Sequence, residues 1–191
     1  MNPIREFKSW FVEEKEQCNL KLPAACCLST IGVDGYPNSR FVSLKAIAND
    51  SFVITGPLDS RKGSEISNSP KAALTFWWTA SERQVRIQGD VSLISESEAA
   101  QYFKNRNRDS KIVSTAFDQG KEIQSIDHLQ ARFKKHKDDL GSEEINRPPH
   151  WGGIYIKPLR MELMQFRQSR LHERRLYTYL NESWEMQVIQ P

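Results

Sequence analysis

The chain has 191 residues, of which 38% are hydrophobic, 27% charged and 10% aromatic, with a mean hydropathy of -0.62. This composition indicates a folded chain with a sizeable core and excludes a disordered one. No apolar run approaches the roughly 18 residues that span a bilayer. No apolar stretch near Met1 is typical of an export signal. We therefore expect a cytoplasmic protein with no membrane partner.

The formal net charge of +3 comes from 27 basic and 24 acidic residues. The densest basic segment, 167–175, is interrupted by Glu173, and the other cations are mixed with acids. Scattered cations suit small phosphorylated ligands better than a polymer backbone, so no nucleic-acid partner is expected. The cysteines at positions 18, 26 and 27 lack metal-ligand spacing, and neither a metal site nor a disulfide is expected.

The first half of the chain predicts one helix followed by short strands. Apolar residues recur every three or four positions in segment 3–18, which is typical of an amphipathic helix. Two β-prone runs, 24–30 and 39–46, flank an Asp34-Gly35 pair, which indicates a hairpin. A strand, a short helix capped by Ser60 and two further strands are predicted next, at 51–55, 60–68, 72–78 and 84–92.

The second half predicts a helix, a polar helical segment and more strands. Ser95 and Glu98 form a capping box that opens a helix through Phe103. The segment 119–141 has a helical period, and prolines at 148 and 149 mark the loop after it. Strands are expected at 153–156, 160–166, 176–180 and 183–189. Short strands with few helices predict a mainly β fold: one antiparallel barrel with helical additions, spanning 1–191.

Two groups of polar residues could bind an anion. Arg61 and Lys62 lie at a predicted helix start, where free N–H groups favour a phosphate. An ordinary basic helix start is the alternative. Tyr102, Arg106 and Ser110 share one helix face if the helix continues through them. A phenol, a guanidinium and a hydroxyl on one stripe suit an oxyanion, and a solvent-facing stripe is the alternative.

A third group lies near the end of the chain. On a strand, Arg170, His172 and Arg174 would share one face, as alternate residues do. Burying them requires an anionic partner, although a lone strand histidine is more often structural. The adjacent Trp77 and Trp78 are both expected in the core.

Taken together, these stretches resemble the pyridoxine/pyridoxamine 5'-phosphate oxidases, FMN enzymes that make pyridoxal 5'-phosphate. The resemblance covers nearly the whole chain. It is carried by Arg40-Phe41-Val42-Ser43-Leu44-Lys45, Ser60-Arg61-Lys62-Gly63, Glu82-Arg83-Gln84-Val85, Tyr102-Phe103-Lys104-Asn105-Arg106 with Asp109-Ser110, Trp151-Gly152-Gly153 and Arg170-Leu171-His172-Glu173-Arg174. It implies a split β-barrel, a homodimer with FMN between subunits, and a small phosphorylated pyridine substrate.

The resemblance also implies individual contacts. FMN would be bound by Arg40, Phe41, Val42, Ser43, Leu44, Lys45, Ile54, Thr55, Arg61, Lys62, Gln84, Gln119, Met164 and Arg174. Substrate would be bound by Lys45, Tyr102, Arg106, Ser110, Arg170, Leu171 and His172. Arg170 and His172 would be the catalytic pair that positions the substrate and assists proton removal.

Several positions depart from the family pattern. Met164 and Phe166 replace a tryptophan and a glycine, Gly120 replaces a serine, and Ile54 replaces a common tyrosine. The sequence also starts at the first helix, without the segment that closes over the substrate in longer members.

The resemblance implies oxidation of pyridoxamine or pyridoxine 5'-phosphate to pyridoxal 5'-phosphate, with dioxygen as acceptor and hydrogen peroxide released. One alternative is an FMN oxidase of the phenazine-biosynthesis type. The retained residues Lys45, Tyr102, Arg106 and Ser110 argue against it, because a substrate without phosphate leaves them unused. The other alternative is a non-enzymatic protein that binds flavin or pyridoxal phosphate.

Overall fold

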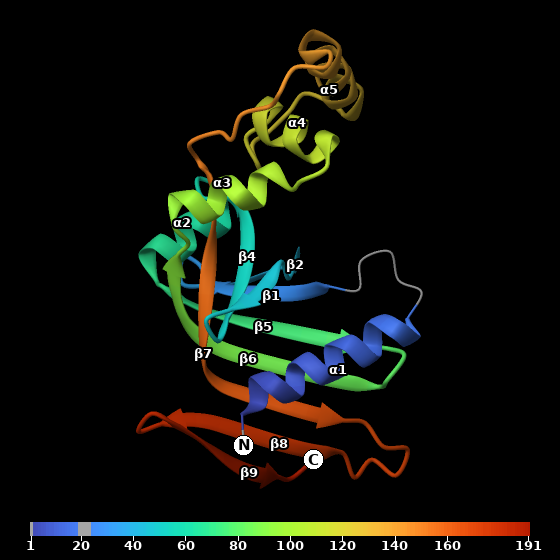
Figure 1. The fold of residues 1–191 in the computed structure, drawn as a ribbon, viewed down its shortest axis with the longest axis vertical. Helices are drawn as coiled ribbons and strands as arrows, with labels where there is room; N and C mark the ends of the chain where they lie inside the picture. Colours follow the sequence, from blue (N-terminus) through green and yellow to red (C-terminus); the bar gives the residue numbers. More distant parts are fainter. Residues whose placement is uncertain (1, 19–23) are drawn as a thin grey trace.

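In the computed structural model, residues 2–18 and 24–191 are described, and this part of the chain holds nine strands in one sheet and five helices (Figure 1). The strands are β1 (Ala25–Ile31), β2 (Pro37–Ser43), β3 (Ala46–Ala48), β4 (Ser51–Pro57), β5 (Lys71–Trp78), β6 (Arg83–Leu93), β7 (Trp151–Gln165), β8 (Glu173–Leu180) and β9 (Ser183–Ile189). The helices are α1 (Pro3–Gln17), α2 (Arg61–Asn68), α3 (Glu96–Lys104), α4 (Arg108–Ala116) and α5 (Ile126–Leu140). None of these helices is long and apolar enough to cross a membrane.

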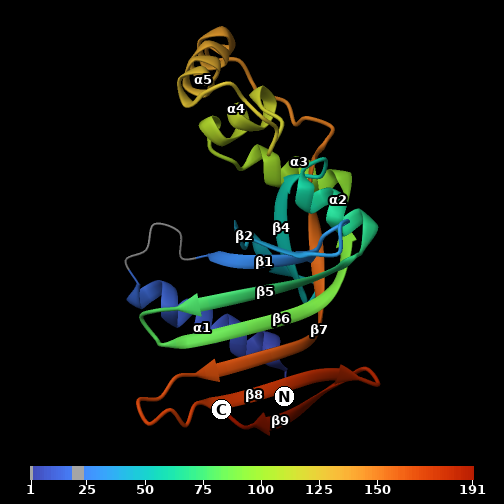
Figure 2. The same ribbon diagram turned by 180° about the vertical axis from the view of Figure 1, so that it is seen from behind.

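The sheet is antiparallel throughout, in the order β2-β1-β5-β6-β7-β4-β3, with β8 and β9 added beside β7. The predicted antiparallel barrel with helical additions is therefore confirmed. Figures 1 and 2 show α3, α4 and α5 at one end of the molecule and the β8–β9 hairpin at the other. This separation of the two ends positions the candidate site.

The strand β7 organises the sheet. It pairs with β4 along Trp151–Ile156 and with β8 along Arg160–Gln165, while β6 runs beside both halves. The two strands predicted at 153–156 and 160–166 are thus one long strand. The register between β6 and β7 skips Leu159, which makes a bulge in β7 beside Gly89. An added Cβ at Gly89 would stand 2.1 Å from the Lys157 carbonyl oxygen, which requires glycine there.

A corner after β2 turns the sheet into a barrel. The 39–46 run does not form one strand: β2 ends at Ser43, and Ala46 belongs to the short β3. Between them, the N–H of Leu44 donates to Ala24 and the N–H of Lys45 donates to Val53. The chain therefore passes from pairing with β1 to pairing with β4 within two residues.

The helix α1 covers the barrel core, as its periodicity predicts. Asn2 caps it, accepting from the N–H of Ile4 at 2.9 Å. Phe7 is fully buried, with ring centroids 5.0 Å from both Phe52 and Phe76. Burying one such side chain stabilises the fold by about 2 kcal/mol.

The prediction that Trp77 lies in the core is wrong. Side chains alternate along β5, so burying Trp78 turns Trp77 to the outside, where it is 50% exposed. Hydrophobic content alone did not distinguish the two positions.

The first helix of the helical region is confirmed. The capping box of Ser95 and Glu98 opens α3, which ends at Lys104, one residue beyond the predicted Phe103. Asn107 then caps a new helix, α4, by accepting from the N–H of Ser110 at 2.8 Å. The helix does not continue through Tyr102, Arg106 and Ser110, so these residues do not form a stripe on one helix face.

The other corrections concern segment ends. The helix expected over 119–141 is confined to α5, which begins at Ile126. The hairpin through Asn181 and Glu182 is confirmed, and their φ angles of 49° and 62° fit a tight turn between twisted strands. The strand β8 begins at Glu173, three residues before the predicted start, so Arg170 and His172 do not share a strand face with Arg174. Arg170 and His172 lie in the preceding loop, where Arg170 has a left-handed φ of 67°.

Candidate functional site

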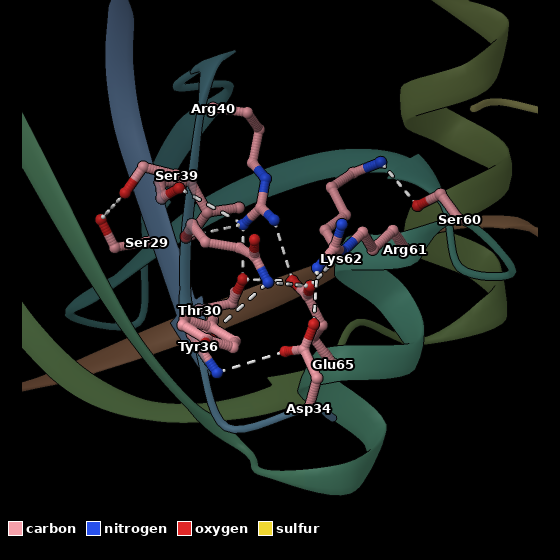
Figure 3. Close-up of polar contacts among 12 residues, drawn as sticks. Ser29, Thr30, Asp34, Tyr36, Ser39, Arg40, Ser60, Arg61, Lys62 and Glu65 are labelled. Carbon is pink, nitrogen blue, oxygen red and sulfur yellow. Dashed lines mark hydrogen bonds and ion pairs between the residues drawn. The ribbon is translucent and has the colours of Figure 1, made fainter. Parts of the chain in front are cut away.

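Three of the predicted phosphate-binding cations converge at the start of α2 (Figure 3). Arg40 comes from β2, and Arg61 and Lys62 form the first turn of α2, which holds no acidic residue. Ser60 precedes the helix but makes no capping bond, because its hydroxyl donates to the Pro57 carbonyl at 2.7 Å. Three cations therefore lie near the N-terminus of α2, where the helix dipole also favours an anion.

The geometry of this turn depends on Gly63. A Cβ at this position would stand 1.9 Å from the Leu58 carbonyl oxygen, so only glycine lets α2 approach the end of β4. That close approach places Lys62 beside the β4 residues that were also expected to contact cofactor.

Two of the three cations share a buried carboxylate. Glu65 accepts from Arg40 at 2.8 Å and from Arg61 at 2.9 Å. Lys62 makes no ion pair within the described ranges, and its ammonium donates to Ser60 at 2.8 Å and also to Gln119. Burial, with the charge of Arg40 as a second cause, lowers the pKa of Lys62 to about 8. The cluster keeps excess positive charge for a ligand to neutralise.

A cavity of about 390 Å³ opens beside this cluster. Its wall includes Thr55, Lys62, Ile54, Leu58 and Ile66. The Thr55 hydroxyl is buried and has no hydrogen-bond partner among the described residues, which is costly unless a ligand supplies one. A cation and an unpartnered hydroxyl on an apolar wall fit a molecule that joins an apolar ring to a phosphate, as FMN does.

The remaining residues of the β2 segment point in different directions. Phe41 is 81% exposed, Val42 and Ser43 are half-buried, and Leu44 is buried in the core. Lys45 lies beyond the end of β2, exposed, in an opening that Lys8 and Lys15 of α1 also line. Within one chain, Lys45 is thus on a different opening from Lys62.

Arg106 and Ser110, expected to bind substrate, do meet, although the helix between them is broken. Arg106 lies between α3 and α4, with its guanidinium 4.8 Å from the ring centroid of Trp151. It donates to the Ser110 carbonyl at 3.1 Å and to the Ser114 hydroxyl at 3.4 Å, and its buried Nε has no hydrogen-bond partner in the described part of the chain. Burial lowers its pKa, and within 2–18 and 24–191 no carboxylate pairs with it. Tyr102 is half-buried on α3, and burial raises its pKa.

A second set of predicted residues lies on the outer face of the sheet. Gln84, Met164 and Arg174 are in register across β6, β7 and β8, with the Gln84 amide 3.9 Å from the Met164 sulfur. Arg174 donates to the buried carboxylate of Glu162 at 2.8 Å. Glu162 is the anionic partner that the sequence requires for a buried arginine here.

His172 belongs to the same end of the molecule. Its Nδ1 accepts from the N–H of Arg167 at 3.1 Å, and its ring lies 4.7 Å from that of Phe166. Phe166 in turn contacts Trp77, at 4.8 Å between centroids. Arg170 and Leu171, next to His172, are exposed. Trp77 was not predicted from the sequence to lie on this outer face. The signal was available, because β5 buries its even-numbered residues and 77 is an odd-numbered position.

These two sets are far apart in one chain. Thr55 pairs with Gly153 at one end of β7, and Gln84 pairs with Met164 near the other. Eleven residues of strand separate these positions, about 36 Å along the strand. The structure thus gathers Arg40, Thr55, Arg61, Lys62 and Gln119 at one end. A single chain does not join them to the outer-face set.

Comparison with known proteins identifies relatives over the whole length. Residues 12–137 match the family model described as pyridoxamine 5'-phosphate oxidase, and residues 151–191 match the pyridoxine 5'-phosphate oxidase C-terminal dimerisation region. A pyridoxine/pyridoxamine 5'-phosphate oxidase of Trichormus variabilis is 42% identical over 191 residues, covering 100% of this chain and 89% of that protein. One of Cupriavidus metallidurans is 38% identical with the same coverage.

Solved structures give the same fold. PhzG from Burkholderia lata, in complex with tetrahydrophenazine-1-carboxylic acid, has a TM-score of 0.92 at 26% identity and covers 100% of this chain and 93% of its own. A pyridoxamine 5'-phosphate oxidase-related, FMN-binding protein from Nostoc punctiforme has a TM-score of 0.82 at 17% identity, with coverage of 100% and 98%. The predicted split barrel is confirmed.

Proposed function

The chain belongs to the pyridoxamine 5'-phosphate oxidase family, and from that premise we propose that it oxidises pyridoxamine or pyridoxine 5'-phosphate to pyridoxal 5'-phosphate. In this proposal FMN is the cofactor, dioxygen is the acceptor, and hydrogen peroxide is released. The protein would act in the cytoplasm, in pyridoxal phosphate synthesis.

The observation that carries the substrate assignment is Arg106. A half-buried guanidinium without a carboxylate partner is costly, and an anionic group of a ligand offsets that cost. Arg106 donates to the backbone carbonyl of Ser110, and Tyr102 packs against the cluster that includes Trp151, the ring that Arg106 contacts. We therefore expect a phosphate bound at Arg106 to be within reach of the Ser110 and Tyr102 hydroxyls. Lys62 and its neighbours would form a separate site for the flavin phosphate. Two anion-binding sites fit a phosphorylated cofactor together with a phosphorylated substrate.

The chain's own residues would orient the two ring systems. FMN, when bound, supplies the acceptor for the hydride that leaves the substrate carbon. Because the N–H of Arg167 occupies Nδ1 of His172, the neutral imidazole carries its proton on Nε2. His172 can therefore donate a hydrogen bond from Nε2 to the substrate oxygen or amine.

The assembly follows from the separation of the two residue sets. The 151–191 segment matches a dimerisation region, and it contains Met164, Arg170, His172 and Arg174. We infer a homodimer in which the Lys62 and Arg106 end of one subunit meets the His172 end of its partner. Each active site would then contain both sets.

The proposal is tested by mixing the flavin-loaded protein with pyridoxamine 5'-phosphate in the absence of oxygen. We expect the flavin absorbance to bleach, and to return with release of hydrogen peroxide when air is admitted. Unphosphorylated pyridoxamine is the control and should bleach the flavin only at much higher concentration. Flavin that stays oxidised at saturating pyridoxamine 5'-phosphate would contradict the proposal and indicate a binding protein.

A second candidate function rests on Met164 and Phe166, the two positions that depart from the tryptophan and glycine of the family pattern. Met164 and Phe166 change the surface beside His172, and PhzG shares the fold closely. A reduced tricyclic phenazine precursor is therefore the rival substrate. Bleaching by such a compound, without bleaching by pyridoxamine 5'-phosphate, would select this function.

The pKa of Lys62 predicts how FMN binding depends on pH. Lys62 is mostly protonated at pH 7 and mostly neutral at pH 9, because burial lowers its pKa to about 8. A bound phosphate dianion favours the protonated form, so binding above pH 8 requires proton uptake and FMN affinity falls by about tenfold from pH 7 to pH 9. Titration of apoprotein by flavin fluorescence measures this. Lys62→Met should remove the dependence, and a slope that persists in that variant would assign it to another group.

A further inference from the structure

Glu65 is the buried carboxylate that Arg40 and Arg61 share in Figure 3. It lies in the middle of α2 and is 1% exposed. Buried carboxylates are rare and need partners, so its position opposite the proposed phosphate site calls for a reason. The three cations could attract a phosphate to this helix without Glu65, and a negative charge near a phosphate is unfavourable on electrostatic grounds alone.

The geometry assigns Glu65 a role: we propose that it is a positioning residue that orients Arg40 and Arg61 for a terminal phosphate, and so makes the protein prefer FMN to riboflavin. This inference rests on the proposed function for its cofactor. Glu65 itself does not touch the ligand in this proposal.

The hydrogen bonds to Glu65 leave its carboxylate fully occupied. Oε2 accepts from Thr30 at 2.5 Å and from Arg40 at 2.8 Å, and Oε1 accepts from Asn38 at 2.7 Å and from Arg61 at 2.9 Å. Burial would raise the pKa of Glu65, but the bonds that it accepts outweigh this effect and hold the pKa below its ordinary value. Four donors match the four lone-pair positions of a carboxylate, so the group stays ionised and fixed.

The same bonds determine which part of each arginine remains available. Arg61 uses Nε on Glu65, and its outer nitrogen makes only a 3.3 Å contact with the exposed Asp34. Arg40 is held by Glu65 through one terminal nitrogen and by Thr30 through the other, at 2.5 Å. Arg61 is thus held at Nε and keeps its terminal nitrogens for a ligand, whereas Arg40 is held at both terminal nitrogens and keeps its Nε. Fixing each guanidinium in this way limits the directions in which it can donate, and this lowers the conformational cost of binding an anion.

Neighbouring Lys62 shows the contrast within the same helical turn. It has no carboxylate partner among the described residues, and its ammonium faces Ser60 and Gln119. The site therefore combines two arginines fixed by one acid with one lysine that retains its charge. Glu65 neutralises one positive charge and orients the two arginines. We therefore expect the site to select a ligand whose phosphate lies at one defined position.

The test compares two flavins in two matched variants. Glu14 is also 1% exposed, but it accepts from Ala80 and Ser81, in the turn between β5 and β6, away from the cations. Apoprotein of wild type, Glu65→Gln and Glu14→Gln is titrated with FMN and with riboflavin by flavin fluorescence. We expect Glu65→Gln to weaken FMN binding by at least about tenfold and riboflavin binding by less than about twofold. Glu14→Gln should lower Tm but leave the ratio of the two affinities unchanged.

Other outcomes overturn separate parts of the inference. An equal loss for both flavins in Glu65→Gln, or no loss for FMN, would show that Glu65 only stabilises the fold. If Glu65→Gln does not fold, Glu65→Asp keeps the charge but draws the arginines back by one methylene, and the FMN preference should fall. An unchanged preference in that variant overturns the role. Wild-type apoprotein that binds both flavins equally would instead refute the cofactor assignment.

Discussion

Replacing Arg106 with alanine is expected to leave FMN binding intact and to raise KM for pyridoxamine 5'-phosphate about thirtyfold, the equivalent of about 2 kcal/mol for one charge-assisted contact. Arg106 lies between α3 and α4, and its side chain contacts Trp151, Ser110 and Ser114 rather than the Lys62 cluster. The loss should therefore concern the substrate phosphate alone. Steady-state kinetics and the flavin content of the purified variant measure the two effects.

The control separates a phosphate contact from a general disturbance of the Trp151 region. Unphosphorylated pyridoxamine lacks the group that Arg106 is proposed to bind, so its KM should not change in Arg106→Ala. Lys104→Ala removes an exposed cation from the end of α3, two residues before Arg106, and should alter neither KM. An equal rise for both substrates in Arg106→Ala would mean that the residue supports the fold, and no rise would mean that Arg106 does not bind the substrate phosphate.

The fold was largely predictable because its main signals are local. Periodicity in α1, the capping box of α3 and the turn residues Asn181 and Glu182 act within a few positions, and each prediction was confirmed. The errors arose where tertiary pairing decides the result. Residue 158 is a proline, yet β7 continues through it because β7 itself bulges at the next residue, Leu159.

The site was predictable in composition but not in arrangement. Spacing placed Arg61 and Lys62 at a helix start, and α2 begins there. It could not show that Glu65, four residues later, would bind two arginines from different elements, because that contact requires β2 to lie against α2. Nor could spacing show the left-handed φ of Arg170, since a left-handed residue in a loop leaves no period in the sequence.

The strongest test of the shared site uses purified heterodimers that carry different substitutions on their two subunits. One subunit carries Arg106→Ala and the other carries His172→Ala, and the rate is measured at substrate well below KM. If each site joins the Arg106 end of one subunit to the His172 end of its partner, this heterodimer has one intact and one doubly altered site. We expect about half of the wild-type rate, although each homodimer alone is at least about thirtyfold slower.

The reciprocal heterodimer makes the result decisive. It pairs a wild-type subunit with one that carries both substitutions, so its composition is the same. With shared sites, each of its two sites contains one altered residue, and the rate should fall to a few per cent of wild type, about twentyfold below the first heterodimer. With sites built within single chains, the two results would be exchanged. The separation of about 36 Å along β7 between the two residue sets is the reason to expect the first outcome.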